Sequence, residues 1–200
     1  ALADLKVYEG SAPDAPTSAR AAAGAAFTIL REGELRVLVQ FSDGSRGWVG
    51  KDGVMVNLPD LIPSILYQDS NAEASLMKNL GQSLDGITNQ KLYEAKVYNE
   101  KLGQEQYIMP VQYRMAEKIM RAQQLAKEQD LTIVLYEGFR SYDVQIEIAD
   151  ALRQLAKENS DTKASIQKNG FNIAYYINTG ISSHQMGSAV DVSLARVDRW

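Results

Sequence analysis

Apolar and polar residues alternate over short distances in the first part of the chain. Turn signals such as Ser42-Asp43-Gly44 and Asp52-Gly53 separate the apolar stretches, and glycine-containing turns of this kind favour tight hairpins. Five short strands are expected, at residues 5–8, 26–30, 35–41, 47–49 and 54–56. The pattern predicts a small all-β barrel over residues 1–57.

The pattern changes after Pro110. Apolar residues recur every three or four positions up to Ala126, which predicts an amphipathic helix opened by Pro110. The β-rich run Leu131–Tyr136 predicts a central strand. A second helix is expected after Asp143, which is placed to cap it, and a third, short one over residues 160–168. The fold class predicted is α+β, with helices packed on a small mixed or antiparallel sheet.

The segment between these two parts has no clean period. Residues 58–64 contain two prolines and are typical of a linker that leads into an ordered segment. Residues 91–102 fit a short helix or an extended stretch, with Tyr93, Val97 and Tyr98 facing inward. Two domains are therefore predicted, at residues 1–57 and 58–200.

Composition argues against several classes of function and of metal site. The 200 residues carry a net charge of −4, which gives no basic surface for nucleic acid. No apolar run approaches the roughly 20 residues of a membrane span. There is no cysteine, so any zinc site must be built from nitrogen and oxygen ligands.

The chain has one histidine, His184, and Asp191 follows it after a glycine-containing turn. Imidazole and carboxylate are both natural zinc ligands. A carboxylate within an apolar strand is costly unless it is paired or bound to a metal. Two interpretations stay open at this point: a metal site formed by His184 and Asp191, or an Asp191 paired with Arg196 or Arg199. Val192 and Leu194 are expected to form the apolar back of this strand.

Two motifs together resemble a known family. The segment Ser182-x-His184-x-x-Gly187-x-Ala189-x-Asp191 resembles the signature of the zinc D-alanyl-D-alanine peptidases, which include D-Ala-D-Ala dipeptidases linked to vancomycin resistance and related D,D-carboxypeptidases. The segment 136–143, with Glu-Gly-Phe-Arg at its centre, resembles that family's strand end with an arginine facing the active site. The resemblance covers roughly residues 58–200.

The resemblance implies a role for each matching residue. His184 and Asp191 would be zinc ligands, and Arg140 would stabilise the oxyanion formed when water attacks the peptide carbonyl. Ser182 would bind substrate near the metal. Without the resemblance, Arg140 reads as a surface arginine or as a partner of Asp143 or Glu137. The implied cofactor is zinc, and the implied substrate is a D-Ala-D-Ala dipeptide or the end of a peptidoglycan stem peptide.

The sequence departs from the family at one point. The family completes its site with a later Glu-x-x-His segment, which supplies the third zinc ligand and the general base, and no such segment follows Asp191 here. We therefore expect this sequence to be the N-terminal portion of a longer enzyme, inactive alone. The alternative is a non-catalytic peptidoglycan-binding or sensing protein.

The N-terminal barrel also resembles a known type. Gly47-Trp48-Val49 followed by a short last strand is similar to bacterial SH3-like domains. That resemblance implies binding to the cell wall and an extracytoplasmic place of work: secreted, periplasmic or cell-wall associated. The sequence does not indicate an oligomeric state.

Overall fold

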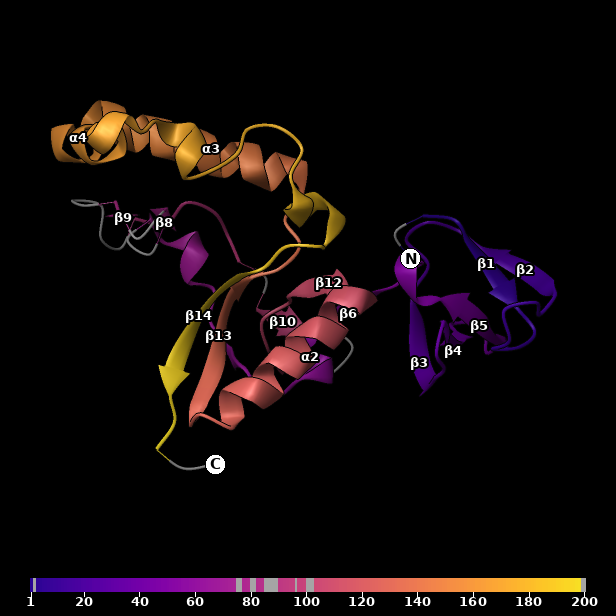
Figure 1. Ribbon diagram of the computed structural model, residues 1–200. Coiled ribbons are helices and arrows are strands. Elements are labelled where there is room, and N and C mark those ends of the chain that lie inside the picture. Colours follow the sequence, from indigo (N-terminus) through magenta and orange to yellow (C-terminus); the bar gives the residue numbers. More distant parts are fainter. Residues whose placement is uncertain are drawn as a thin grey trace.

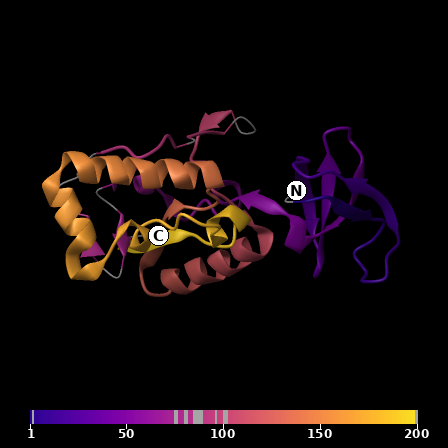
Figure 2. The same ribbon diagram turned by 90° about the horizontal axis from the view of Figure 1, so that it is seen from above.

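The structure is a computed structural model that describes residues 1, 3–74, 77–79, 82–84, 90–95, 97–99 and 103–198. A sheet-based unit built from the first fifty residues lies to one side of the molecule (Figure 1). The helices and the other sheets form the larger part on the opposite side. Figure 2, the view from above, shows α2 and α3 on either side of the strand that leads to the C-terminus.

Five antiparallel strands form the N-terminal sheet, in the order β2-β1-β5-β4-β3. They are β1 Leu5–Tyr8, β2 Thr17–Ala21, β3 Phe27–Glu32, β4 Arg36–Phe41 and β5 Arg46–Gly50. Val37, Val39 and Val49 are fully buried at its centre. In β4, Val37 and Val39 alternate with the half-buried Leu38 and Gln40, which explains why the pattern predicted this strand.

One of the five predicted strands was assigned to the wrong sheet. Residues 54–56 do not join this sheet, and β2 stands in their place as an edge strand next to β1. Only Ala21 of β2 is buried, so this strand lacks the apolar alternation that signals the others. The likeness to an SH3-like barrel and the domain division at residue 57 stay predictions.

The segment after β5 joins the N-terminal sheet to the rest of the chain. Strand β6, Met55–Asn57, pairs antiparallel with β12, Pro110–Gln112. The backbone of Pro110 is thus part of a strand ladder, and the helix expected to open there begins three residues later. Tyr113, the first residue of that helix, packs into the valine core of the N-terminal sheet.

A buried lysine reinforces this junction. Lys51 lies 2.6 Å from Glu32 of β3 and 2.7 Å from Glu117 of the following helix. Burial on its own lowers the pKa of Lys51, but the hydrogen bonds to Glu117 and Glu32 outweigh burial and raise it. The ammonium group therefore stays charged and links the two parts of the chain.

A mixed three-stranded sheet organises the larger part. Its order is β14-β13-β7, with β14 antiparallel and β7 parallel to the central strand. The strands are β7 Leu66–Tyr67, β13 Leu131–Glu137 and β14 Asp191–Arg196. The predicted central strand is confirmed, and so is the α+β fold class.

Four α-helices are described: α1 Leu58–Leu61, α2 Tyr113–Lys127, α3 Tyr142–Glu158 and α4 Ser160–Gln167. Ser141, rather than Asp143, caps α3, because its hydroxyl accepts a hydrogen bond from the Val144 amide. The short 3-10 turns are η1 Lys51–Gly53, η2 Ser70–Ala72, η4 Lys168–Gly170, η5 Ile173–Tyr175 and η6 Ser183–Met186.

Two further cores hold the larger part together. In one, α2 packs on β13 through Ala116, Ile119 and Leu135. In the other, α3 packs on the segment around residues 72–93 through Ile148 and Leu152. That segment carries the two-residue strands β8 Lys78–Asn79 and β9 Gln82–Ser83, and the paired strands β10 Tyr98–Asn99 and β11 Gln104–Glu105 follow it.

Two expectations for this segment can be checked. Tyr93 is buried as predicted, whereas Val97 is 45% exposed. The side chain of Tyr98 and residues 96 and 100–102 lie outside the described part of the chain. No described helix is long and apolar enough to cross a membrane.

Candidate active site

Antiparallel pairing places Asp191 beside the end of β13. Glu137, the last residue of β13, is opposite Asp191, the first residue of β14, with an irregularity in the register just before this pair. Arg140 follows three residues after the strand end and is 7% exposed. Arg140 thus lies just after a strand end, where the motif placed it, and close to a carboxylate of the neighbouring strand.

The loop between η5 and β14 carries His184 to the same place. Its turn η6 ends at Gly187, which has a φ of +66°. A Cβ at this position would lie 2.9 Å from Met55 Cε and 3.1 Å from the Gln112 nitrogen. Glycine is therefore required both for the left-handed conformation and for the close approach of the loop to β12.

Backbone hydrogen bonds fix the loop against the strand end. The Arg140 amide donates to the carbonyl of His184 at 3.3 Å, and the Gln112 amide donates to the carbonyl of Gly187 at 2.8 Å. His184 Nδ1 lies 2.8 Å from the carbonyl oxygen of Gly138. Since a carbonyl only accepts, Nδ1 carries a proton, and in the neutral imidazole Nε2 then keeps a free lone pair.

That lone pair faces Asp191. His184 Nε2 lies 3.7 Å from Asp191 Oδ1, and Arg140 Nη1 lies 4.0 Å from Asp191 Oδ2. Asn71 donates a hydrogen bond to Asp191 Oδ2 at 2.5 Å, while the other carboxylate oxygen, Oδ1, faces His184. The alternative partner Arg196 is not seen with Asp191, and Arg199 lies outside the described residues.

All four predicted site residues line one cleft. Its volume is about 690 Å³, and Arg140, Ser182, His184 and Asp191 lie on its wall with Tyr136 and Tyr176. Arg140 also makes a buried ion pair with Glu137, as the alternative interpretation of this arginine as a partner of Glu137 predicted. Its Nε is buried and has no hydrogen-bond partner among the described residues.

One expectation about β14 was wrong. Val192 and Leu194 were expected to form an apolar back for Asp191, but they are 51% and 58% exposed. Strand β14 is an edge strand that pairs only with β13 in the described sheet. The site is therefore held from the β13 side and from the His184 loop.

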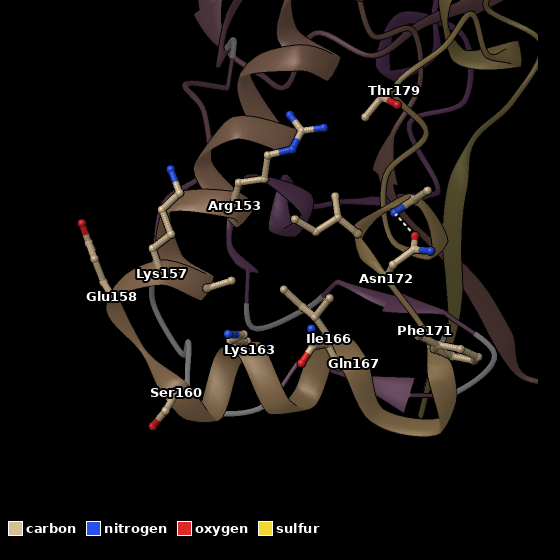
Figure 3. A pocket seen from close by; sticks show the side chains of 13 residues that line it. Arg153, Lys157, Glu158, Ser160, Lys163, Ile166, Gln167, Phe171, Asn172 and Thr179 are labelled. Carbon is tan, nitrogen blue, oxygen red and sulfur yellow. Dashed lines mark hydrogen bonds between the residues drawn. The ribbon is translucent and has the colours of Figure 1, made fainter.

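A larger cavity lies elsewhere. It has a volume of about 1000 Å³ and is bounded by the C-terminal half of α3, by α4 and by residues 171–179. Figure 3 shows Arg153, Lys157 and Lys163 around it. It contains neither the histidine nor a carboxylate pair, so the chemistry of a metal site favours the smaller cleft at His184.

The sequence analysis missed Gln145. This α3 side chain is fully buried beside Ile148 and Leu152. Its Oε1 accepts from Ser182 Oγ at 2.9 Å and from Gln185 Nε2 at 2.8 Å, and its Nε2 donates to the carbonyl of Gly180 at 2.5 Å. A polar residue on the apolar stripe of a helix was the available signal, because a buried amide must find partners.

We expect Gln145→Leu to lower the free energy of unfolding by about 2 kcal/mol, because it leaves the donors of Ser182 and Gln185 without an acceptor. Chemical denaturation measures the change. Gln154→Leu is the matched control, since Gln154 is exposed on the same helix and bonds only to Glu158 in the hydrogen bonds seen. Equal losses in the two variants would show that Gln145 does not hold the loop.

A second carboxylate group lies behind the site. Tyr93 Oη lies 2.8 Å from Glu137 Oε1 and 3.1 Å from Asp69 Oδ1. Burial is the main reason why the pKa of Asp69 rises to about 6; the charge of Glu137 adds to the rise, and the hydrogen bond from Tyr93 opposes it. Burial also raises the pKa of Tyr93, so its hydroxyl keeps its proton.

This shift predicts a pH-dependent stability. Because the pKa of Asp69 is higher in the folded state, its contribution to stability is complete below about pH 4 and is lost as the pH rises through about 6. Asp69→Asn removes this titration. Between pH 4 and 7.5, the free energy of unfolding of the variant should therefore rise by roughly 1 kcal/mol relative to that of wild type. This figure is reduced for the solvent screening of a half-buried carboxyl group. A pH-independent difference in urea melts would contradict this.

Comparison with known proteins agrees with the motifs. Residues 109–199, a little under half of the chain, match the family model "VanY: D-alanyl-D-alanine carboxypeptidase". No curated protein matches the chain significantly.

Two solved structures are similar to parts of the chain. One is a mutant of the vancomycin-resistance D,D-pentapeptidase VanY from a VanB-type cassette, in complex with Zn(II). It is 20% identical, with a TM-score of 0.31, and the match covers 50% of this chain and 52% of that one. The other is VanYB in complex with D-alanine-D-alanine, also 20% identical, with a TM-score of 0.34 and 59% of each chain covered. The chain thus matches little more than half the length of either structure.

The matched range contains both motifs and all four predicted site residues, Arg140, Ser182, His184 and Asp191. Residues 109–199 are therefore similar to the D-alanyl-D-alanine carboxypeptidase family, as the motifs predicted.

Proposed function

We propose that this protein is a zinc-dependent D,D-peptidase, which hydrolyses D-Ala-D-Ala as a dipeptide or at the end of a peptidoglycan stem peptide. One observation carries the proposal. His184 Nε2 faces Asp191 Oδ1 across 3.7 Å in a cleft that also holds Arg140 and Ser182. The family match over residues 109–199 supports the same reaction.

The pair fits a zinc ion. Two ligands about 2.0–2.1 Å from a tetrahedral ion lie roughly 3.3 Å apart, so a small adjustment of a 3.7 Å pair accommodates one. Zinc-binding histidines donate their other ring N–H to a carbonyl or carboxylate, as His184 does to Gly138. Asn71 similarly orients Asp191. Both candidate ligands have the supporting partners that a metal site requires.

The other residues have separate tasks. Bound zinc would supply Lewis acidity and an acidified water. The guanidinium of Arg140 is placed to stabilise negative charge that develops on the carbonyl oxygen of the scissile peptide. Ser182 Oγ donates to Gln145 and keeps lone pairs that can accept from a substrate amide.

The proposal assigns two ligands to the described residues. No group of three histidine, cysteine, aspartate or glutamate side chains suited to a metal is found within the described part of the chain. The third ligand and the general base are therefore left unassigned. The experiments use the protein as its gene encodes it, with the native C-terminus.

D-Ala release tests the proposal. The protein should release D-Ala from D-Ala-D-Ala, or from a stem pentapeptide ending in it, and should not cleave L-Ala-L-Ala. Removing the metal with a chelator should abolish release, and added Zn²⁺ should restore it. Comparison of the two D-substrates separates a dipeptidase from a carboxypeptidase. A protein that contains zinc but leaves both D-substrates intact would contradict the proposed function and favour a non-catalytic wall-binding protein.

We also propose that residues 1–57 bind the cell wall, which places the protein outside the cytoplasm. The five-stranded N-terminal sheet, attached to α2 through the buried Lys51, supports a separate binding unit. The intact protein should sediment with insoluble peptidoglycan. If it stays in the supernatant while it still hydrolyses soluble substrate, the wall-binding role is wrong and the peptidase role is unaffected.

A further inference from the structure

The orientation of Arg140 depends on a buried glutamate. Arg140 Nη1 makes an ion pair with Glu137 Oε2, and both side chains are 7% exposed. The guanidinium also contacts Gln145 of α3, but this hydrogen bond is weak, since Arg140 Nη2 lies 3.5 Å from Gln145 Oε1. Glu137 is therefore the main group that holds the guanidinium of Arg140.

Glu137 is itself held by a tyrosine. Its Oε2 is occupied by Arg140 and, at 3.5 Å, by Asn71, while its Oε1 accepts from Tyr93 Oη at 2.8 Å. With both oxygens engaged, the plane of the carboxylate cannot rotate without losing a hydrogen bond. A hydrogen bond from a neutral donor to a buried carboxylate is one of the stronger kinds in proteins.

Packing alone does not fix this arrangement. A cavity of about 170 Å³ lies behind Arg140, with Tyr93, Glu137 and Val144 in its wall. Because atoms are missing from this side, side-chain orientation here must come from hydrogen bonds. Tyr93 comes from a segment more than forty residues before Arg140 and is itself buried.

We propose that Tyr93 is a positioning residue for Arg140 and acts through the carboxylate of Glu137. The proposal rests on the peptidase function and adds a residue to it. Tyr93 has one proton for two carboxylates, and the shorter contact, 2.8 Å to Glu137 Oε1 against 3.1 Å to Asp69 Oδ1, assigns that proton mainly to Glu137. Tyr93 sets the carboxylate plane, and the carboxylate sets the direction of the guanidinium that meets the substrate oxyanion.

Kinetics of Tyr93→Phe in the intact protein test this. The variant should lose about tenfold in kcat for D-Ala release, because misplacement of a catalytic group by a fraction of an ångström slows the reaction without weakening substrate binding. KM and zinc content should stay as in wild type. Tyr67→Phe is the control, since Tyr67 Oη donates to the Ile62 carbonyl, away from Arg140. A kcat for Tyr93→Phe within twofold of that for Tyr67→Phe would overturn the proposal.

A second measurement does not depend on activity. ¹⁵N NMR of the arginine side chains reports rotation about the Nε–Cζ bond. Arg140 should rotate slowly in wild type and in Tyr67→Phe, and at least about tenfold faster in Tyr93→Phe. An unchanged rate in Tyr93→Phe would overturn the positioning role even in a protein that releases no D-Ala. Faster rotation in such a protein would uphold the contact and refute only the peptidase function.

Discussion

Replacing His184 by alanine is expected to remove bound zinc and to lower kcat/KM for D-Ala release by more than about 100-fold. Loss of an outer partner of a metal ligand already costs roughly 10–100-fold in affinity or activity, and His184 is proposed as a ligand itself. Its Nε2 is the only imidazole ligand atom within residues 1–200 that is free for a metal. Zinc content by elemental analysis and D-Ala release measure the two effects.

NMR of the histidine side chains gives a direct test. Added Zn²⁺ should shift the ¹⁵N signal of His184 Nε2, which is assigned by its absence in His184→Ala, while Nδ1 stays protonated through Gly138. Asp150→Asn is a suitable control, because Asp150 is exposed on α3 and pairs with Arg153. Zinc content unchanged in His184→Ala would rule out this site, whatever the kinetics.

The regular elements of the larger part were predictable because their patterns are local. Strand β13 is a short β-rich and mostly apolar run that lies between two helices in the sequence. The helices α2 and α3 each bury one of their own faces. The edge strand β2 and the β6–β12 pair were not predictable in the same way. Strand β2 buries one residue, and β6 finds its partner more than fifty residues further along the chain. Neither feature leaves a periodic signal.

In the candidate site, too, the residues in local motifs were predictable and those that depend on distant contacts were not. Arg140, Ser182, His184 and Asp191 were predicted from two short motifs that resemble those of a known family. Their supporting residues were not. Asn71 meets Asp191 across 120 positions of sequence. Such contacts depend on the tertiary fold, and no local sequence pattern predicts them.

Gln145 is an intermediate case. It lies on the helix face that carries Ile148 and Leu152, so its burial could be inferred from the 3.6-residue period. Its partners in the His184 loop could not be inferred, since they begin 35 residues later. A buried polar residue on a predicted apolar stripe is therefore a useful pointer to a site, even when its contacts are unknown.

Arg140→Lys is expected to lower kcat for D-Ala release by about 10²–10³-fold, with a smaller change in KM. Removal of one preorganised oxyanion donor has this order of effect. Lysine keeps the positive charge that Glu137 requires in the buried ion pair, whereas alanine would leave that carboxylate unpaired and could cost 3–5 kcal/mol of stability. Lysine lacks the planar fork, so it cannot bond to Glu137 and also present a second donor to the substrate.

Zinc content and thermal stability separate this effect from loss of the site. Both should stay close to wild type in Arg140→Lys, because the 4.0 Å separation of Arg140 from Asp191 leaves the proposed ligands in place. Arg153→Lys, an exposed change on α3, is the matched control. A kcat within threefold of wild type would show that the guanidinium does not stabilise the transition state. Arg140 would then be a structural partner of Glu137, and the proposed catalytic chemistry would depend on the metal site without help from this arginine.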